Sequence, residues 1–97
     1  MQKEIDKWIH ENTTGYWPPL SMMARLTEET GELSRVLNHV YGMKKKKENE
    51  VLNSIEEELG DLLYTIVCIA NKFDIDLDHA YDKTLKKYSI RDKDRFK

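Results

Sequence analysis

The 97-residue sequence has few of the residues that interrupt regular structure, with four glycines and two prolines. Helices or strands can therefore run for many residues before they end. It also has a single cysteine, Cys68, which excludes an internal disulfide framework and is typical of a reducing compartment. Cys68 lies in the apolar stretch LLYTIVCIAN, residues 62–71, so we expect a buried and unreactive thiol.

Long apolar runs and an excess of charge of one sign are missing as well. The uncharged apolar run of residues 62–71 is too short to cross a bilayer, and residues 1–12 lack the apolar core of a signal peptide. The net charge of −2 indicates neither nucleic acid nor an acidic membrane as a partner. We therefore expect a cytoplasmic protein that binds no membrane and no nucleic-acid polymer.

What is present is a chain rich in both charged and apolar residues, at 35% and 39% of the sequence. Its length predicts a single domain, residues 1–97, with one modest core. Apolar residues recur at helical spacing in four segments, which cover residues 2–12, 19–41, 48–73 and 77 onward. The pattern predicts four helices.

The predicted ends of these helices carry suitable residues. Pro18 and Pro19 suit the first turn of the second helix, and Asp76 or Asp78 suits the N-cap of the fourth. Gly42 is a natural stop for the second helix. The lysine run 44–47 after it is predicted to be a solvated loop, although a flap over phosphate stays open as an alternative.

The predicted fold class is all-α and bundle-like, with the helices over 19–41 and 48–73 as a long antiparallel pair. Residues 62–70 are uncharged on every side of their helix, and Tyr64, Val67 and Cys68 are predicted to point away from its main apolar stripe. A helix that is apolar all round is buried all round, and a short chain has little material to cover a second face. We therefore expect a homo-oligomer that assembles through this helix.

Two acidic stretches lie inside these apolar patterns, LTEETGEL at 26–33 and IEEELGDLL at 55–63. At about 100° per residue, Glu29 and Glu32 fall at the border of one apolar stripe, whereas Glu28 falls nearly opposite. Glu58 and Asp61 fall at the border of the stripe on the next long helix. Each helix thus offers a pair of acids at i,i+3 spacing, where like charges repel.

An antiparallel pair of helices could bring these four carboxylates together in one cleft. In a partly desolvated cleft four bare anions would be untenable, and a hard divalent cation with oxygen ligands, Mg²⁺ or Mn²⁺, would resolve the repulsion. The alternative is that each acid belongs to an ordinary solvated helix surface. The spacing alone leaves both interpretations open.

The motif EETGE at 28–32, followed after 25 residues by ELGD at 58–61, resembles the E-E-x-x-E…E-x-x-D signature of MazG-like nucleoside triphosphate pyrophosphohydrolases. The resemblance extends over most of the chain and is to the short, single-domain bacterial branch. It implies an all-α homodimer or homotetramer. It also implies Mg²⁺-dependent cleavage of a (d)NTP between the α- and β-phosphates to (d)NMP and pyrophosphate, in nucleotide-pool house-cleaning.

The resemblance also implies roles for individual acids. Glu29, Glu32, Glu58 and Asp61 would be the metal ligands, in agreement with their places on the two helices. Glu28, which falls outside this set, would orient the attacking water or lie behind the ligands.

Basic and aromatic residues should complete such a site. The segment KKYSIRD, residues 86–92, resembles the family's basic segment, so Lys87 and Arg91 are expected to contact phosphate, with Lys83 as a further candidate. Asn71 and Trp17 are expected nucleoside contacts by the same resemblance. A chance surface pair, a polar helix end and a core tryptophan are the ordinary alternatives for these residues.

Two other classes of function compete with an enzyme. One is a non-catalytic helical oligomeric interaction module, in which the acids hold a structural cation. The other is a carboxylate-bridged di-iron bundle, which needs Glu-x-x-His pairs that the sequence does not contain. The sequence determines neither the preferred base nor the number of metal ions.

Overall fold

The computed structural model describes residues 1–41 and 48–92, and its regular elements are four helices. They are α1 (Gln2–Asn12), α2 (Pro19–Tyr41), α3 (Glu48–Lys72) and α4 (Leu77–Asp92). The all-α prediction is confirmed, and the predicted bounds differ from these by about a residue. The predictions for Gly42 and the lysine run 44–47 lie outside the described residues.

The connection between α1 and α2 is short and depends on one glycine. Gly15 has a φ of 129°, a left-handed conformation that side chains disfavour. Its backbone N–H donates to Thr13 Oγ1 at 3.1 Å, and the Thr13 hydroxyl donates to the Ile9 carbonyl at 2.7 Å. Pro19 then opens α2 as its first residue, where a missing N–H is harmless. The chain therefore turns sharply before the long pair of helices begins.

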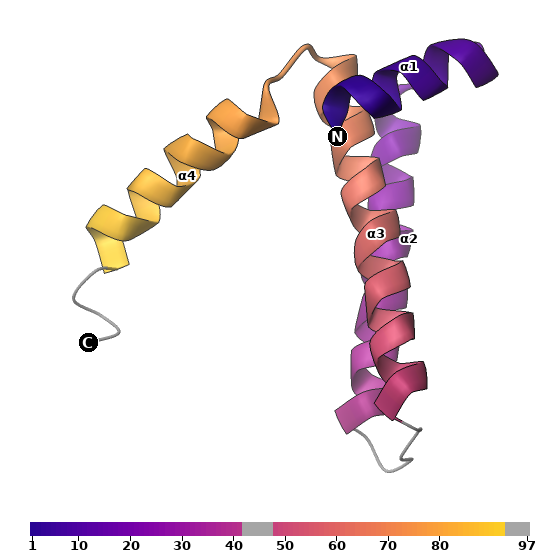
Figure 1. Ribbon diagram of the computed structural model, residues 1–97, viewed down its shortest axis with the longest axis vertical. Coiled ribbons are helices and arrows are strands. Elements are labelled where there is room, and N and C mark those ends of the chain that lie inside the picture. Colours follow the sequence, from indigo (N-terminus) through magenta and orange to yellow (C-terminus); the bar gives the residue numbers. More distant parts are fainter. Residues whose placement is uncertain (42–47, 93–97) are drawn as a thin grey trace.

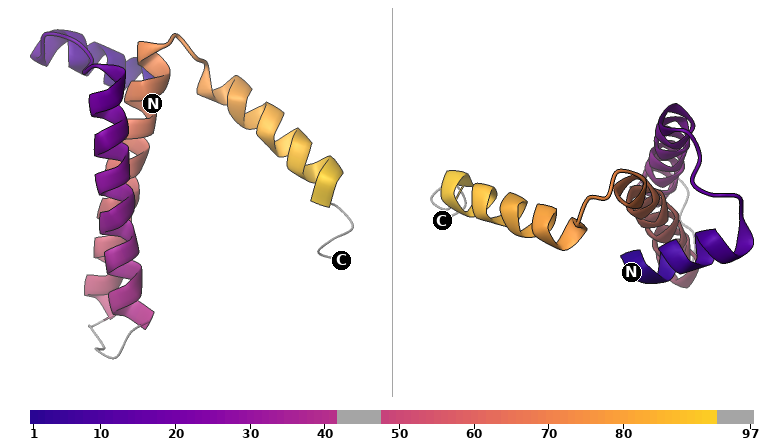
Figure 2. Two further views of the ribbon diagram at one scale, coloured as in Figure 1. Left: turned by 180° about the vertical axis from the view of Figure 1, so that it is seen from behind. Right: turned by 90° about the horizontal axis from the view of Figure 1, so that it is seen from above.

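α2 and α3 lie side by side along their length and run in opposite directions (Figure 1). α1 crosses the end of the pair where α2 begins and α3 ends, and α4 leaves from that same end and extends away from it (Figure 2). The antiparallel pair is thus as expected, but α4 does not complete a bundle within the chain. In the described part of the chain no helix is long and apolar enough to cross a membrane.

The core lies where three helices meet. Ile9 of α1, Met22 of α2 and Cys68 of α3 are buried together, and Ile5, Tyr16 and Ile69 pack around them. Burial raises the pKa of the Cys68 thiol, which keeps it protonated at neutral pH. This agrees with the expectation of a buried, unreactive cysteine.

One expectation about α3 is wrong. Val67 and Cys68 were expected to face another copy of the chain, but they are only 1% and 8% exposed within a single chain. The reason is that α1 crosses this part of α3 and covers it. By their helical spacing, Leu59 and Leu63 belong to the main apolar stripe of α3, yet they are 50% and 43% exposed. The pattern of α3 predicted two apolar faces, but the assignment of Val67 and Cys68 to contacts with another copy was wrong.

A set of hydrogen bonds at the α1 end of the molecule fixes α1 to α3, and we call it the polar corner: Gln2, Asp6, Tyr16 and Asn71. Asn71 Nδ2 donates to the Gln2 carbonyl and to the Tyr16 hydroxyl, both at 3.0 Å, while Gln2 Nε2 donates to Asn71 Oδ1 at 3.0 Å. The Tyr16 hydroxyl donates to Asp6 Oδ1 at 2.6 Å. Burial, followed by this bond to Asp6, raises the pKa of Tyr16 to about 12.

The polar corner also sets where α4 begins. Gln2 Nε2 donates to the Ile75 carbonyl, and Gln2 Oε1 accepts from the Leu77 N–H, both at 2.8 Å. Asp76 Oδ1 accepts from the Asp78 N–H at 2.9 Å, so Asp76 is the N-cap of α4 and the first of the two expected candidates is confirmed.

Candidate metal centre

Glu29 of α2 and Glu58 and Asp61 of α3 form an acidic cluster between the two long helices. Each can place one carboxylate oxygen so that the three oxygens lie within 4.8 Å of one another. Three oxygens this close suit one hard divalent cation, because the oxygen ligands of such cations generally lie at roughly 2.0–2.6 Å from the metal. The structure therefore brings together three of the four acids that the sequence predicted as metal ligands.

Glu58 shows the strongest effect of this crowding. Its Oε2 is buried and finds no hydrogen-bond partner among the described residues. Burial raises the pKa of Glu58 above its usual value, and nearby negative charges raise it further; in decreasing order these belong to Glu32, Asp61, Glu29 and Glu57. A buried oxygen without a partner is costly, and a cation would supply the missing interaction.

Glu29 is 7% exposed and therefore the most buried of the three acids. Its Oε1 lies 2.9 Å from Arg25 Nε, one turn earlier on α2. This ion pair partly compensates the burial of a charge and holds the carboxylate in place. The sequence analysis did not identify Arg25, although its i,i+4 spacing from Glu29 could have indicated it.

Glu32 lies at the margin of the acidic cluster, whereas Glu28 lies outside it. Glu32 forms an ion pair with Arg35, one turn further along α2. Among the nearby charges, that of Glu32 nevertheless raises the pKa of Glu58 most, so Glu32 lies near the cluster. Glu28 is exposed, as its place on the helical wheel predicted.

The basic candidates lie on α4 and are not brought to the acidic cluster within one chain. Lys83, Lys87 and Arg91 are exposed on a helix that extends away from α2 and α3 (Figure 1). Lys87 Nζ and the Arg91 guanidinium lie 4.9 Å and 4.5 Å from the centre of the Tyr88 ring. Their contact with phosphate stays a prediction.

Asn71 and Trp17 have different surroundings. Both polar groups of the Asn71 amide are engaged in the polar corner, about 15 Å along α3 from Asp61 at 1.5 Å per residue. Trp17 is 57% exposed and lies in the wall of a cavity. Both residues remain predicted nucleoside contacts, and only Trp17 lies beside a space that a ligand could occupy.

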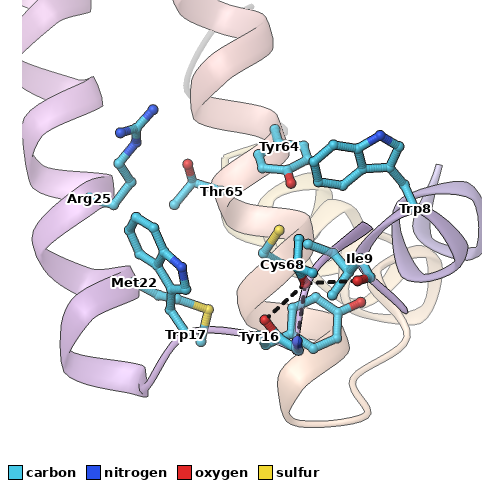
Figure 3. A pocket seen from close by; sticks show the side chains of 11 residues that line it. Trp8, Ile9, Tyr16, Trp17, Met22, Arg25, Tyr64, Thr65 and Cys68 are labelled. Atoms are coloured by element: carbon cyan, nitrogen blue, oxygen red, sulfur yellow. Dashed lines mark hydrogen bonds between the residues drawn. The ribbon is translucent and has the colours of Figure 1, made fainter. Parts of the chain in front are cut away.

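That cavity, drawn in Figure 3, has a volume of about 310 Å³, and Arg25, the ion-pair partner of Glu29, lies in its wall. α1, the α1–α2 connection, α2 and α3 all contribute to its wall, in which aromatic side chains are prominent. Trp8 and Tyr64 meet edge to face in its wall, with ring centres 6.4 Å apart. Sequence analysis missed the cavity because its wall comes from four segments with no common spacing.

The acidic cluster fits a divalent cation by its chemistry. Its donors are carboxylate oxygens, which Mg²⁺ and Mn²⁺ prefer, and one of them is buried without a partner. The described histidines, His10, His39 and His79, are exposed and not part of the cluster. A cation held here would have a small aromatic cavity on one side. An extended ligand with an anionic end and an aromatic end would require this arrangement.

Comparisons with known proteins agree with this geometry. Residues 18–96 match a family model described as the MazG nucleotide pyrophosphohydrolase domain. YpjD of Bacillus subtilis is 52% identical over 96 residues, which span 99% of this chain and 86% of YpjD.

Two crystal structures are similar in fold. That of YpjD from Bacillus subtilis has a TM-score of 0.78 and 50% identity, over 94% of this chain and 91% of that one. That of a Bacillus-conserved MazG protein, described as a nucleotide pyrophosphohydrolase, has a TM-score of 0.79 and 50% identity, over 97% and 90% of the two chains. These matches confirm the resemblance that EETGE and ELGD indicated.

Proposed function

Because the chain belongs to the MazG nucleotide pyrophosphohydrolase family, we propose that it is a Mg²⁺-dependent nucleoside triphosphate pyrophosphohydrolase. It cleaves a (d)NTP between the α- and β-phosphates and gives (d)NMP and pyrophosphate, with nucleotide-pool house-cleaning as its role. The observation that supports this best is the acidic cluster, in which a buried Glu58 oxygen has no partner among the described residues.

Glu29, Glu58 and Asp61 hold the cation in this proposal, and Glu32 joins them by turning away from Arg35. A Mg²⁺ or Mn²⁺ ion held by these acids would supply charge neutralisation for the triphosphate and would favour deprotonation of the attacking water. Arg25 keeps the Glu29 carboxylate oriented through the bond from its Nε. Glu28, which is exposed and lies outside the acidic cluster, is proposed to orient the attacking water or to lie behind the ligands.

The leaving pyrophosphate needs positive charge that the acidic cluster does not supply. Lys87 and Arg91, with Lys83, are proposed to contact the phosphates. Since α4 extends away from the acidic cluster of its own chain, these side chains would reach the cluster of another copy. A homodimer or homotetramer is therefore part of the proposal.

The apolar surface of the chain supports such an assembly. Large apolar side chains are exposed on α3 and α4, which present Leu59, Leu63, Ile66, Tyr81, Leu85 and Tyr88. Exposed apolar groups gathered on one surface are typical of an interface. Sedimentation velocity is expected to give a dimer or tetramer, and Leu63→Lys is expected to shift it toward monomer. A monomeric wild-type protein would refute this part of the proposal.

The reaction is tested by its products. Purified protein with Mg²⁺ and a panel of standard and modified (d)NTPs is expected to release pyrophosphate and not phosphate. Glu58→Gln, which keeps the shape of the side chain but removes its charge, is expected to lower the rate at least about 100-fold, since a catalytic metal contributes several kcal/mol. Glu56→Gln, an exposed neighbour on α3, serves as the matched control.

Two outcomes would contradict the proposal. Release of phosphate would exclude cleavage between the α- and β-phosphates. Unchanged pyrophosphate release by Glu58→Gln would remove the acidic cluster from the reaction and favour the alternative of an interaction module with a structural cation.

A further inference from the structure

α4 is held to its own chain at its start. Leu77 and Ala80, in its first turn, are half-buried, whereas all of residues 81–91 are exposed. The helix extends away from α2 and α3 as a separate arm (Figure 1, Figure 2). Among the described residues, the direction of α4 is therefore set by its first turn and by the connection before it, residues 73–76.

This connection begins with a well-defined helix end. Asp74 has a φ of 54°, the left-handed conformation that often ends a helix and that Asp tolerates better than most residues. The Ile75 N–H donates to the Ala70 carbonyl at 2.8 Å, and the Asp74 N–H donates to the Asn71 carbonyl at 3.3 Å. These two bonds form a Schellman motif, so the chain leaves α3 with a defined backbone geometry.

Gln2 of α1 bridges the connection to α4. Its Nε2 donates to the Ile75 carbonyl, and its Oε1 accepts from the Leu77 N–H, both at 2.8 Å. The same Nε2 also donates to Asn71 Oδ1 at 3.0 Å, which uses both of its hydrogens. One side chain thus joins the last turn of α3, the connection and the first residue of α4.

A small change of angle at this bridge becomes large at the far end of α4. Leu77 and Arg91 are about 21 Å apart along the helix, at 1.5 Å per residue. A turn of about 10° at Leu77 would therefore move Arg91 by about 4 Å, more than the length of a hydrogen bond. A misplacement of about 1 Å can already lower a rate about 100-fold.

We propose that Gln2 is a positioning residue for the reaction. Its bonds to Ile75 and Leu77 set the direction of α4, and this direction brings the basic side chains of α4 to the acidic cluster of a second copy. The proposal rests on the function proposed above and adds a residue of α1, which acts through α4 and not by contact with the substrate.

The direction of α4 can be measured without any catalytic step. Spin labels attached through Ser34→Cys on α2 and Ser89→Cys on α4 report the distance between the two helices, and both serines are exposed. Cys68 is 8% exposed and therefore protected from the label. Doubly labelled protein is mixed with an excess of unlabelled protein, so that the distances are those within one chain. A narrow distribution is expected with Gln2 present, and a broader or shifted one in Gln2→Ala.

The effect on the reaction is measured as kcat/KM for pyrophosphate release. Lys87→Ala combined with Arg91→Ala is expected to lower kcat/KM at least about 10-fold, since a hydrogen bond to a charged group contributes that factor or more. Gln2→Ala is expected to lower it by a comparable factor in the otherwise unsubstituted chain. In the double variant, Gln2→Ala should change it by less than about 2-fold, because independent effects would multiply. A role in stability alone would give the same factor in both backgrounds.

Two further variants control for side-chain shape and for the position on α1. Lys3→Ala, at an exposed neighbouring position, is expected to leave the distances and kcat/KM unchanged. Gln2→Glu keeps the shape of the side chain and the acceptor for the Leu77 N–H, but the charged carboxylate cannot donate to Ile75. It is expected to behave like Gln2→Ala, and it takes the place of that variant if circular dichroism shows Gln2→Ala to be unfolded.

Unchanged distances in the Gln2 variants would overturn the proposal, as would equal losses of kcat/KM with and without Lys87 and Arg91. Changed distances with an unchanged kcat/KM would also overturn it and would keep the reaction. Absence of pyrophosphate release from every triphosphate by the unsubstituted protein would instead refute the proposed function. Changed distances in the Gln2 variants would then still support Gln2 as the residue that sets the direction of α4.

Discussion

The polar corner and the acidic cluster are both groups of polar side chains packed between helices, but they differ in how their hydrogen bonds close. In the polar corner, Asn71 and Gln2 satisfy each other, and Tyr16 finds both a donor and an acceptor. In the acidic cluster, Glu58 and its neighbours are all acceptors when charged, and one buried oxygen has no described partner.

This difference separates a structural polar group from a binding site. A hydrogen-bond network in which every group has a partner lowers the free energy of the folded chain by itself. A set of neighbouring carboxylates raises that free energy unless a cation is bound. The polar corner should therefore respond to substitution by losing stability. Substitution of an acid in the acidic cluster should remove function but should make the metal-free protein more stable.

The largest expected effect on stability comes from Asn71→Ala. The substitution removes three hydrogen bonds to Gln2 and Tyr16 and leaves their partners unsatisfied, at a net cost of about 1 kcal/mol each. Urea denaturation at one fixed protein concentration is expected to show a free energy of unfolding lower by about 3 kcal/mol. Asn12→Ala is the control, since Asn12 bonds only to the exposed carbonyl of Trp8 among the bonds described. Equal losses in the two variants would place the polar corner among ordinary surface groups.

Alkaline pH is expected to open the polar corner through Tyr16. Its pKa is raised from 10.0 to about 12 in the folded chain, so its contribution is complete below pH 10 and is lost as the pH rises toward 12. A shift of this size corresponds to about 2–3 kcal/mol. Thermal unfolding measured between pH 9 and 12 should show this loss in the wild type.

Tyr16→Phe provides the comparison for that titration. The variant lacks the ionising hydroxyl, so its stability should fall less over the same range, while Tyr64, whose pKa is also raised by burial, titrates in both proteins. Parallel curves for the wild type and the variant would contradict a role of Tyr16 in alkaline unfolding.

Glu58→Gln is expected to change stability in the opposite direction from Asn71→Ala. Because the folded-state pKa of Glu58 is raised, its stabilising contribution is present below the pKa of the unfolded chain and is lost as the pH rises through the folded value. In metal-free protein at neutral pH the variant should therefore be more stable than the wild type. Thermal unfolding with and without Mg²⁺ should show stabilisation by the ion in the wild type alone. A less stable Glu58→Gln protein would mean that the carboxylates of the acidic cluster find sufficient partners without a cation.

The smallest expected effect is at Gly31, which lies between Glu29 and Glu32 on α2. A Cβ at this position would meet nothing within 4 Å, and alanine favours a helix over glycine by about 1 kcal/mol. Gly31→Ala should raise the unfolding temperature and leave pyrophosphate release unchanged. If it instead lowers the rate, the open space beside the acids is used by the substrate or by a second copy of the chain.

Much of the fold follows from local sequence. The helical spacing of apolar residues, Pro19 at the start of α2 and Asp76 before α4 were enough to predict four helices nearly to the residue. What the spacing could not supply was the direction of α1, which covers Val67 and Cys68 and leaves Leu59 exposed. A helical wheel describes one helix, and the choice between two apolar faces depends on the segment that crosses it.

The candidate site likewise has residues that the sequence predicted and residues that only the structure revealed. The spacing of the acids placed Glu29, Glu58 and Asp61 on facing helix borders, and the structure brings them within reach of one ion. The aromatic cavity has no such signal, because its wall combines side chains of α1, α2, α3 and a connection. Arg25 has a local signal, its spacing from Glu29, but its position between acids and cavity is visible only in three dimensions.

The sequence by itself therefore determined the helices, the two acidic pairs and the MazG family, because each depends on the spacing of residues within one or two helices. Only the tertiary structure decided which acid is buried without a partner, that Asn71 closes the polar corner, and that Trp17 borders a cavity. These depend on where α1 crosses the long pair, and that crossing is fixed by contacts between residues as distant in sequence as Gln2 and Asn71.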